Sequence, residues 1–218
     1  MFKEFAKIPR LNRNCVITEK IDGTNAQICI ERVEPPLTEI SGYELGWIYF
    51  PVWNGIQLRM RAGSRSRWIS PGDDNFGFAR WVASNAVELV TLGEGQHFGE
   101  WWGSGIQRGY GLTKGEKRFS LFDVSKWNDP KRSEVGFNYL LTRDSRACPA
   151  CCTVVPVLFV GQFGTENVYA CLNDLMFFGG SLAAPGFDRP EGVIVYHEAA
   201  RILFKATCEN DGKAKGEK

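Results

Sequence analysis

The chain is predicted to fold as an α+β protein with a largely antiparallel sheet. Segments with a strand pattern outnumber those with a helical pattern, and hairpin-like turns separate them. That succession is typical of antiparallel sheets with helices packed against them. A length of 218 residues and a hydrophobic content of 44% are ordinary for one globular domain with a full core. We therefore expect a single domain over residues 1–211 and a disordered, Lys- and Gly-rich basic tail over 212–218.

The strand pattern is clearest where Ala26, Ile28 and Ile30 alternate with more polar residues. Such alternation is expected of a strand with one buried face. Glycine, proline and charged residues punctuate the chain between such segments. Strands are expected at residues 15–21, 25–33, 46–53, 57–63, 96–103, 118–124, 153–160, 191–197 and 200–207.

Apolar residues recur at helical spacing in two places. The first follows Asp73-Asp74-Asn75, whose side chains can cap a helix. The second begins at Thr165 and is closed by Gly179-Gly180. Helices that pack on the core are therefore expected at about 79–90 and 165–178.

The charge and the cysteine content limit the classes of function. A formal net charge of +1 excludes a global positive field, so nucleic-acid binding would need a local patch. No apolar run approaches a membrane span, and the N-terminus lacks the apolar segment of a signal peptide, so we expect a cytoplasmic protein without membrane contact.

Seven cysteines are consistent with reduced thiols. Cys148, Cys151 and Cys152 offer zinc ligands, but no second pair follows at a regular spacing, which favours free thiols.

Lys20 and Asp22 form the most unusual feature of the first expected strand. Side chains two apart on a strand share a face, so both would project together, and Gly23 frees the backbone to turn. A charged pair on the inner face of a strand is unusual, and a nucleophilic lysine that a carboxylate orients or polarises would account for it. A surface lysine is the alternative, because a tetrapeptide this short also occurs by chance.

A basic run follows on the expected strand at 57–63. Arg59, Arg61, Arg65 and Arg67 lie at alternate positions except at one break. The planar guanidinium group suits phosphate, which favours anion binding over a solvated edge strand.

The polar residues that interrupt the apolar strands occur in an order that resembles the covalent nucleotidyltransferase superfamily of polynucleotide ligases and capping enzymes. The resemblance spans residues 18–207. The similar segments are Glu19-Lys20-Ile21-Asp22-Gly23, Ser64-Arg65, Phe98-Gly99-Glu100, Phe119-Ser120-Leu121-Phe122-Asp123, Glu191-Gly192-Val193-Ile194-Val195 and Leu203-Phe204-Lys205. Thr24-Asn25 and Gly99-Glu100-Trp101-Trp102-Gly103 look most like the phage-type RNA ligases that repair nicked duplexes.

The resemblance implies an adenylyltransferase domain that uses ATP and Mg²⁺ or Mn²⁺. Because the chain ends just after the last motif, the C-terminal domain that most such ligases append is expected to be absent. Lys20 would attack the α-phosphate of ATP, the AMP would move to a 5′-phosphate end, and a 3′-hydroxyl would then attack that end. RNA is the favoured substrate, and a monomer in a bacterial or phage-infected cell is expected.

The residue roles are also implied by the resemblance. Catalytic roles fall to Lys20, Asp22 and Lys205. The expected ATP contacts are Glu19, Lys20, Arg65, Glu100, Phe122, Glu191 and Lys205, and the metal contacts are Asp22 and Glu191. The expected nucleic-acid contacts are Asn25, Arg61, Arg67 and Arg108.

Two positions depart from the pattern. Asp22 stands where the phage-type subgroup usually has a histidine, and Leu203 stands where the superfamily has the first lysine of Lys-x-Lys. Arg201 or an arginine of the basic run is a candidate substitute. The alternatives are a DNA or mixed nick ligase, a GTP-using capping-type enzyme of the same fold, or a non-catalytic nucleic-acid-binding relative.

Overall fold

The structure is a computed structural model that describes residues 2, 4–37, 42–44, 46–132 and 145–209. It divides into two compact units, one formed by residues 1–21 with 156–218 and the other by residues 22–155. The single domain expected over 1–211 stays a prediction, and the expected tail at 212–218 lies outside the described residues.

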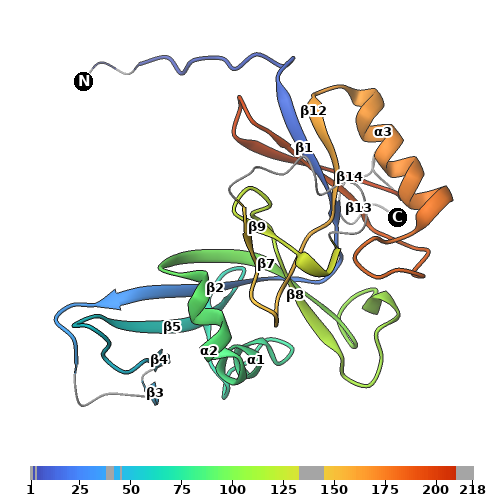
Figure 1. Ribbon diagram of the computed structural model, residues 1–218. Coiled ribbons are helices and arrows are strands. Elements are labelled where there is room, and N and C mark those ends of the chain that lie inside the picture. Colours follow the sequence, from blue (N-terminus) through green and yellow to red (C-terminus); the bar gives the residue numbers. More distant parts are fainter. Residues whose placement is uncertain (1, 3, 38–41, 45, 133–144, 210–218) are drawn as a thin grey trace. The chain divides into compact units, whose positions relative to one another are not determined.

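The first unit is built on a four-stranded antiparallel sheet in the order β12-β1-β13-β14. Its core contains Cys15, Ile17, Val193 and Val195 from the sheet, packed against Cys171, Leu172 and Leu175 of the helical segment. Figure 1 shows the helix α3 beside this sheet. The elements are β1 (Asn14–Lys20), β12 (Val157–Gln162), α3 (Thr165–Asn173) with its π-helical continuation η5 (Asp174–Gly179), β13 (Gly192–His197) and β14 (Ile202–Thr207).

The second unit contains an eight-stranded sheet in the order β11-β8-β7-β2-β5-β4-β3, with β6 also paired to β5. All its pairs are antiparallel except β11 with β8. Its strands are β2 (Thr24–Val33), β3 (Gly42–Glu44), β4 (Trp47–Tyr49), β5 (Gln57–Ser64), β6 (Trp68–Ile69), β7 (Gly95–Gly103), β8 (Lys117–Leu121) and β11 (Thr153–Val154). A separate small pair joins β9 (Trp127–Asn128) to β10 (Arg146–Ala147).

The helical parts of the second unit are short: α1 (Phe78–Ser84), α2 (Ala86–Leu89), and the 3₁₀ turns η1 (Val90–Leu92), η2 (Gly109–Gly111) and η3 (Pro130–Arg132). Phe78 on α1 packs its ring 5.4 Å from Trp101 and 5.0 Å from Phe119 on the sheet. The carboxylate of Asp74 accepts hydrogen bonds from the backbone N–H groups of Ala79 and Arg80, as the predicted capping requires.

The α+β class and the antiparallel sheets are confirmed, whereas several element boundaries were wrong. The strand expected at 153–160 is two strands, β11 and β12, that belong to different units, because Pro156 cannot donate to a ladder. The helix expected at 79–90 is interrupted at Asn85, and the strand expected at 46–53 is only three residues long. No helix in the described ranges is long and apolar enough to cross a membrane.

All seven cysteines are free thiols, as predicted. Cys151 and Cys152 place their sulfur atoms 4.0 Å apart. Across the described residues, no three His, Cys, Asp or Glu side chains are grouped so that they could hold a metal ion.

Candidate active site

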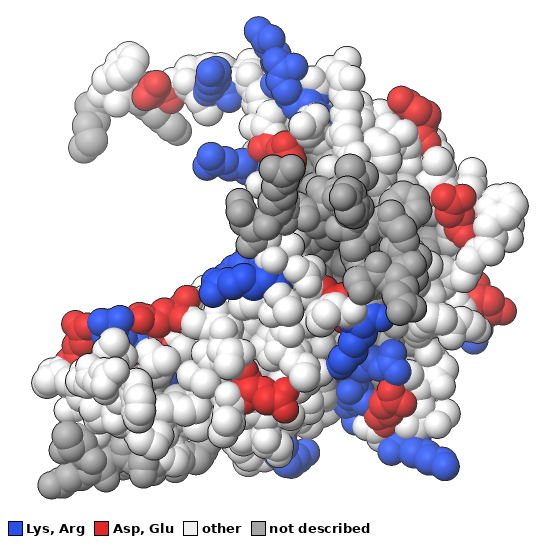
Figure 2. Space-filling model, viewed as in Figure 1, with Lys and Arg blue, Asp and Glu red and all other residues white. Residues whose placement is uncertain are grey.

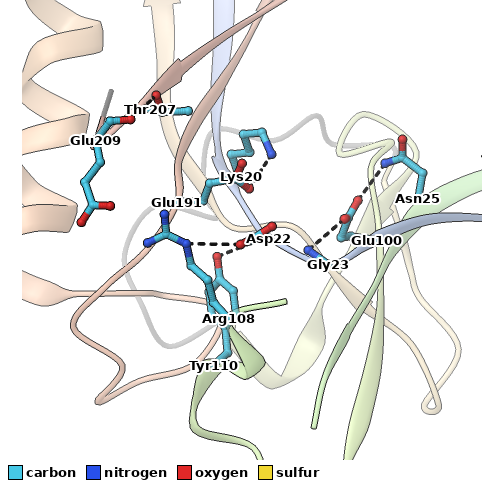
Figure 3. A network of polar contacts seen from close by, with 10 residues as sticks. All are labelled: Lys20, Asp22, Gly23, Asn25, Glu100, Arg108, Tyr110, Glu191, Thr207 and Glu209. Atoms are coloured by element: carbon cyan, nitrogen blue, oxygen red, sulfur yellow. Dashed lines mark hydrogen bonds and ion pairs between the residues drawn. The ribbon is translucent and has the colours of Figure 1, made fainter. Parts of the chain in front are cut away.

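Lys20 is the last residue of β1 and lies opposite Gly192 of the neighbouring strand β13. Glu191 directly precedes that glycine, and its Oε2 accepts a 2.5 Å hydrogen bond from Lys20 Nζ (Figure 3). The two side chains are only 22% and 19% exposed. Two residues that the resemblance named separately are therefore joined in one half-buried ion pair.

Glycine is required at position 192 for this arrangement. The φ angle of Gly192 is +152°, and a Cβ there would lie 2.2 Å from the carbonyl oxygen of Ala206 on β14. The backbone around it is fixed because the N–H of Cys208 donates to the carbonyl of Glu191 at 2.9 Å. The close approach of β14 therefore fixes the backbone position from which the Glu191 side chain extends to Lys20.

Glu19 points away from Lys20, as alternation along β1 requires. Its carboxylate is 1% exposed and accepts hydrogen bonds from the Ser181 hydroxyl at 2.5 Å and the Ala183 N–H at 2.9 Å. The side chain thus holds the segment at 181–184 against β1. The predicted contact of Glu19 with ATP stays a prediction.

Asp22 follows the end of β1 and belongs to the second unit. Its carboxylate forms an ion pair with Arg108, whose Nε lies 3.2 Å from Oδ2, and its backbone N–H donates to the Tyr110 hydroxyl at 2.9 Å (Figure 3). Tyr110 is buried and has a φ of +50°, a left-handed conformation that is uncommon for a bulky residue. The expectation that Asp22 shares a strand with Lys20 was wrong, because the strand ends at Lys20.

Glu100 organises the backbone after Asp22. It lies opposite Asn25 in the β2–β7 ladder, accepts a 2.8 Å hydrogen bond from Asn25 Nδ2, and accepts a 3.1 Å hydrogen bond from the N–H of Gly23. A Cβ at Gly23 would lie 2.5 Å from the carbonyl oxygen of Trp101. Gly23 is therefore needed for close packing, and the 7% exposed carboxylate of Glu100 is preorganised by two donors.

The basic run does not share one face as predicted. Arg59 and Arg61 lie on β5, whereas Arg65 and Arg67 lie in the turn after it. Arg67 forms a two-pronged ion pair with Asp73, and Arg65 is exposed. Figure 2 likewise shows Lys and Arg in separate groups among acidic and uncharged residues on the face drawn, in keeping with the low net charge.

The remaining predicted contacts are exposed groups. Phe122, just after β8, is 41% exposed. Lys205 is exposed on β14, and Leu203, two residues before it on the same strand, is 66% exposed. Arg201 lies in the turn that precedes β14 with a φ of +53°.

Two contacts within the site were not predicted from the sequence. The Tyr110 hydroxyl meets the Asp22 backbone across 88 positions, and no motif marks it. The pairing of Lys20 with Glu191 spans 171 positions. The available signal was that Lys20 lies near the end of the strand expected at 15–21 and Glu191 at the start of the strand expected at 191–197.

The chain was compared with protein families, curated proteins and solved structures. A family model described as RNA ligase matches residues 13–211. Among solved structures, the chain is similar to an alanine mutant of Naegleria gruberi RNA ligase with ATP and Mn at 18% identity and a TM-score of 0.47, covering 90% of this chain and 50% of that one. A second mutant of that ligase, with ATP and Mn, gives 17% identity, a TM-score of 0.49, and coverages of 91% and 51%. The chain spans about half the length of these structures, and no curated protein matches.

Proposed function

Because the chain belongs to the RNA ligase family, we propose that it joins RNA ends at the expense of ATP, with Lys20 as the covalent nucleophile. The observation that carries the proposal is the half-buried pair of Lys20 and Glu191, at 2.5 Å. A lysine at a strand end, held by a carboxylate from the adjacent strand, is positioned as an oriented nucleophile.

The first step moves an adenylyl group to Lys20. Nζ attacks the α-phosphorus of ATP, a P–N bond forms, and the bond from that phosphorus to the bridging oxygen breaks, so pyrophosphate leaves. The ammonium must lose a proton before it can attack, and the Glu191 carboxylate, 2.5 Å away, is positioned to accept it. Removing Glu191 would therefore affect both the orientation of Lys20 and its proton transfer.

The later steps transfer the AMP to a 5′-phosphate end and then join that end to a 3′-hydroxyl with release of AMP. Glu100, with two donors already fixing it, is assigned to the ribose, and the exposed ring of Phe122 to the purine. Arg65 and Lys205 are exposed cations assigned to the phosphates. Asn25, Arg67 and Arg108 are assigned to the RNA strand.

The carboxylate of Asp22, in the second unit, and that of Glu191, in the first, are each of the donor type that Mg²⁺ or Mn²⁺ takes. Mg²⁺ is often held by one or two carboxylates together with substrate phosphates, so a preformed cluster of three protein ligands is not required. The ion would supply positive charge to the phosphates. Within its own unit, each carboxylate already has a cationic partner, Arg108 for Asp22 and Lys20 for Glu191.

A non-catalytic RNA-binding protein is the second candidate, and Leu203 favours it. An exposed leucine replaces a lysine that the superfamily places beside the phosphates. The ligase proposal includes the expectation of a monomeric, cytoplasmic enzyme of bacterial or phage origin, with DNA or mixed nicks and GTP as alternative substrates.

Incubation with α-labelled ATP or GTP and Mg²⁺ tests the proposal. We expect acid-labile label on the wild-type protein from ATP, no label on Lys20→Arg, and normal labelling of the control Lys126→Ala. Sealing of nicked RNA, DNA and mixed duplexes then identifies the acceptor. A folded wild-type protein that takes label from neither nucleotide would leave only the binding function.

A further inference from the structure

Four side chains of the second unit form a stack on one face of its sheet. The guanidinium carbon of Arg59 lies 4.2 Å from the ring centroid of Trp47, and that of Arg61 lies 4.1 Å from the same ring. Arg61 also lies 3.6 Å from the ring centroid of Trp68. We call Arg59, Trp47, Arg61 and Trp68 the arginine–tryptophan stack.

The backbone is shaped to hold this stack. Trp68 lies opposite Gly63 in the β5–β6 pair, and a Cβ at Gly63 would lie 2.9 Å from the Trp68 ring. Glycine at this position therefore lets the indole lie against the sheet. Glu31, directly opposite on β2, holds Arg59 in an ion pair, which fixes one end of the stack.

Arg61 differs from the neighbouring arginines in its charge balance. Arg59 is neutralised by Glu31 and Arg67 by Asp73. Among the residues that the structure describes, Arg61 has no carboxylate partner, and its buried Nε has no hydrogen-bond partner. A cation positioned by stacking and left without an acidic partner is suited to bind an anionic group.

A pocket of about 210 Å³ adjoins the stack, lined mainly by Trp47, Arg61, Trp68, Ile69, Ser70 and Asp73. Sites that enclose drug-sized ligands have volumes of roughly 300–1,000 Å³. This pocket is smaller, so it suits a small part of a ligand, such as a single base. Trp68 is 39% exposed, so part of its ring is accessible to a ligand.

We propose that the arginine–tryptophan stack and its pocket hold one unpaired nucleotide of single-stranded RNA. The base stacks on Trp68, and the phosphate lies against Arg61. Aromatic stacking with an adjacent arginine is the usual way in which proteins bind unpaired bases without reading their sequence. The inference rests on the proposed function for its choice of RNA as the ligand.

The stack lies on the same sheet face as the Glu100–Asn25 pair. Asn25 and Cys29 share a face of β2 by alternation, Glu100 lies opposite Asn25, and Arg61 lies opposite Cys29. Four residues along a strand span about 14 Å. The stack thus lies about 14 Å along the sheet from Asn25, which is also assigned to the RNA strand.

The test measures the binding of a short fluorescent single-stranded RNA whose ends are blocked, so that it cannot be joined. We expect Trp68→Ala to weaken binding about 5- to 100-fold, the loss typical of one stacked base. Trp68→Phe should retain most of the affinity, whereas Arg61→Lys should lose affinity because it keeps the charge without the planar group. Trp53→Ala is the matched control, since Trp53 is 77% exposed and outside the stack.

Circular dichroism of each variant verifies its fold. Wild-type affinity in both Trp68→Ala and Arg61→Lys would overturn the inference, as would equal losses with single-stranded and fully duplex RNA. ATP labelling of the wild type is measured in parallel. If RNA binding depends on the stack but ATP does not label the protein, the RNA site is supported and the ligase function is refuted. If ATP labels the protein but RNA binding does not depend on the stack, only the RNA site is refuted.

Discussion

The ion pair between Lys20 and Glu191 should stabilise the first unit measurably. We expect Glu191→Gln to lower the free energy of unfolding, because it removes the charge of the Glu191 carboxylate from the half-buried ammonium of Lys20. Lys20→Met, which removes the cation, completes a double-mutant cycle with the combined variant.

The magnitude follows from the exposure of the pair. Ion pairs at the surface contribute about 0.2–1 kcal/mol, and breaking a fully buried pair costs about 3–5 kcal/mol. With side chains 22% and 19% exposed, this pair lies between those limits. We expect a loss of about 1–3 kcal/mol for Glu191→Gln, which corresponds to a decrease in Tm of about 2–12 °C for a chain of this size.

The choice of probe is set by where the tryptophans lie. All seven belong to residues 22–155, the second unit, whereas Lys20 and Glu191 belong to the first. Tryptophan fluorescence therefore follows the wrong unit, and urea unfolding should be recorded by far-UV circular dichroism. If the two single losses add to within about 0.5 kcal/mol of the double variant, the residues do not interact and the geometry of the site is wrong.

Three further predictions concern the second unit. Burial lowers the pKa of His97. The contribution of the neutral imidazole to stability is therefore complete above the unfolded pKa of about 6.5 and declines as the pH falls below that value. Thermal melts should show this decline, and His97→Gln should make the decline smaller. A hydrogen bond from Cys152 lowers the pKa of Cys151, so iodoacetamide should modify Cys151 first, and peptide mapping that finds another cysteine modified earlier would contradict this. Glu100→Ala should cost about 1–3 kcal/mol by leaving the Gly23 N–H without its acceptor, whereas Glu100→Gln should cost less, as tryptophan fluorescence would report.

Features encoded by local pattern could be predicted from the sequence. Ala26, Ile28 and Ile30 are all buried on β2, as their alternation indicated. Asp74 caps the helix that follows it. These features depend on neighbours within a few residues, where backbone geometry alone determines which side chains share a face.

Features that depend on distant partners could not be predicted. The apolar run at 153–160 resembles one strand, and only the pairing of its two halves with different sheets reveals the break at Pro156. Tyr110 lies in a glycine-rich loop whose path is set by tertiary contacts, so its bond to the Asp22 backbone had no local signal. The arginine–tryptophan stack likewise joins three strands, and the spacing of the arginines indicated only a basic surface.

The most direct test of the central claim is to locate the adenylyl group. The protein is incubated with ATP and Mg²⁺, digested under conditions that preserve the P–N bond, and its peptides are sequenced by mass spectrometry. The account predicts AMP on Lys20 of the wild type and none anywhere in Lys20→Arg. AMP on a different residue, or AMP that persists in that variant, would contradict it.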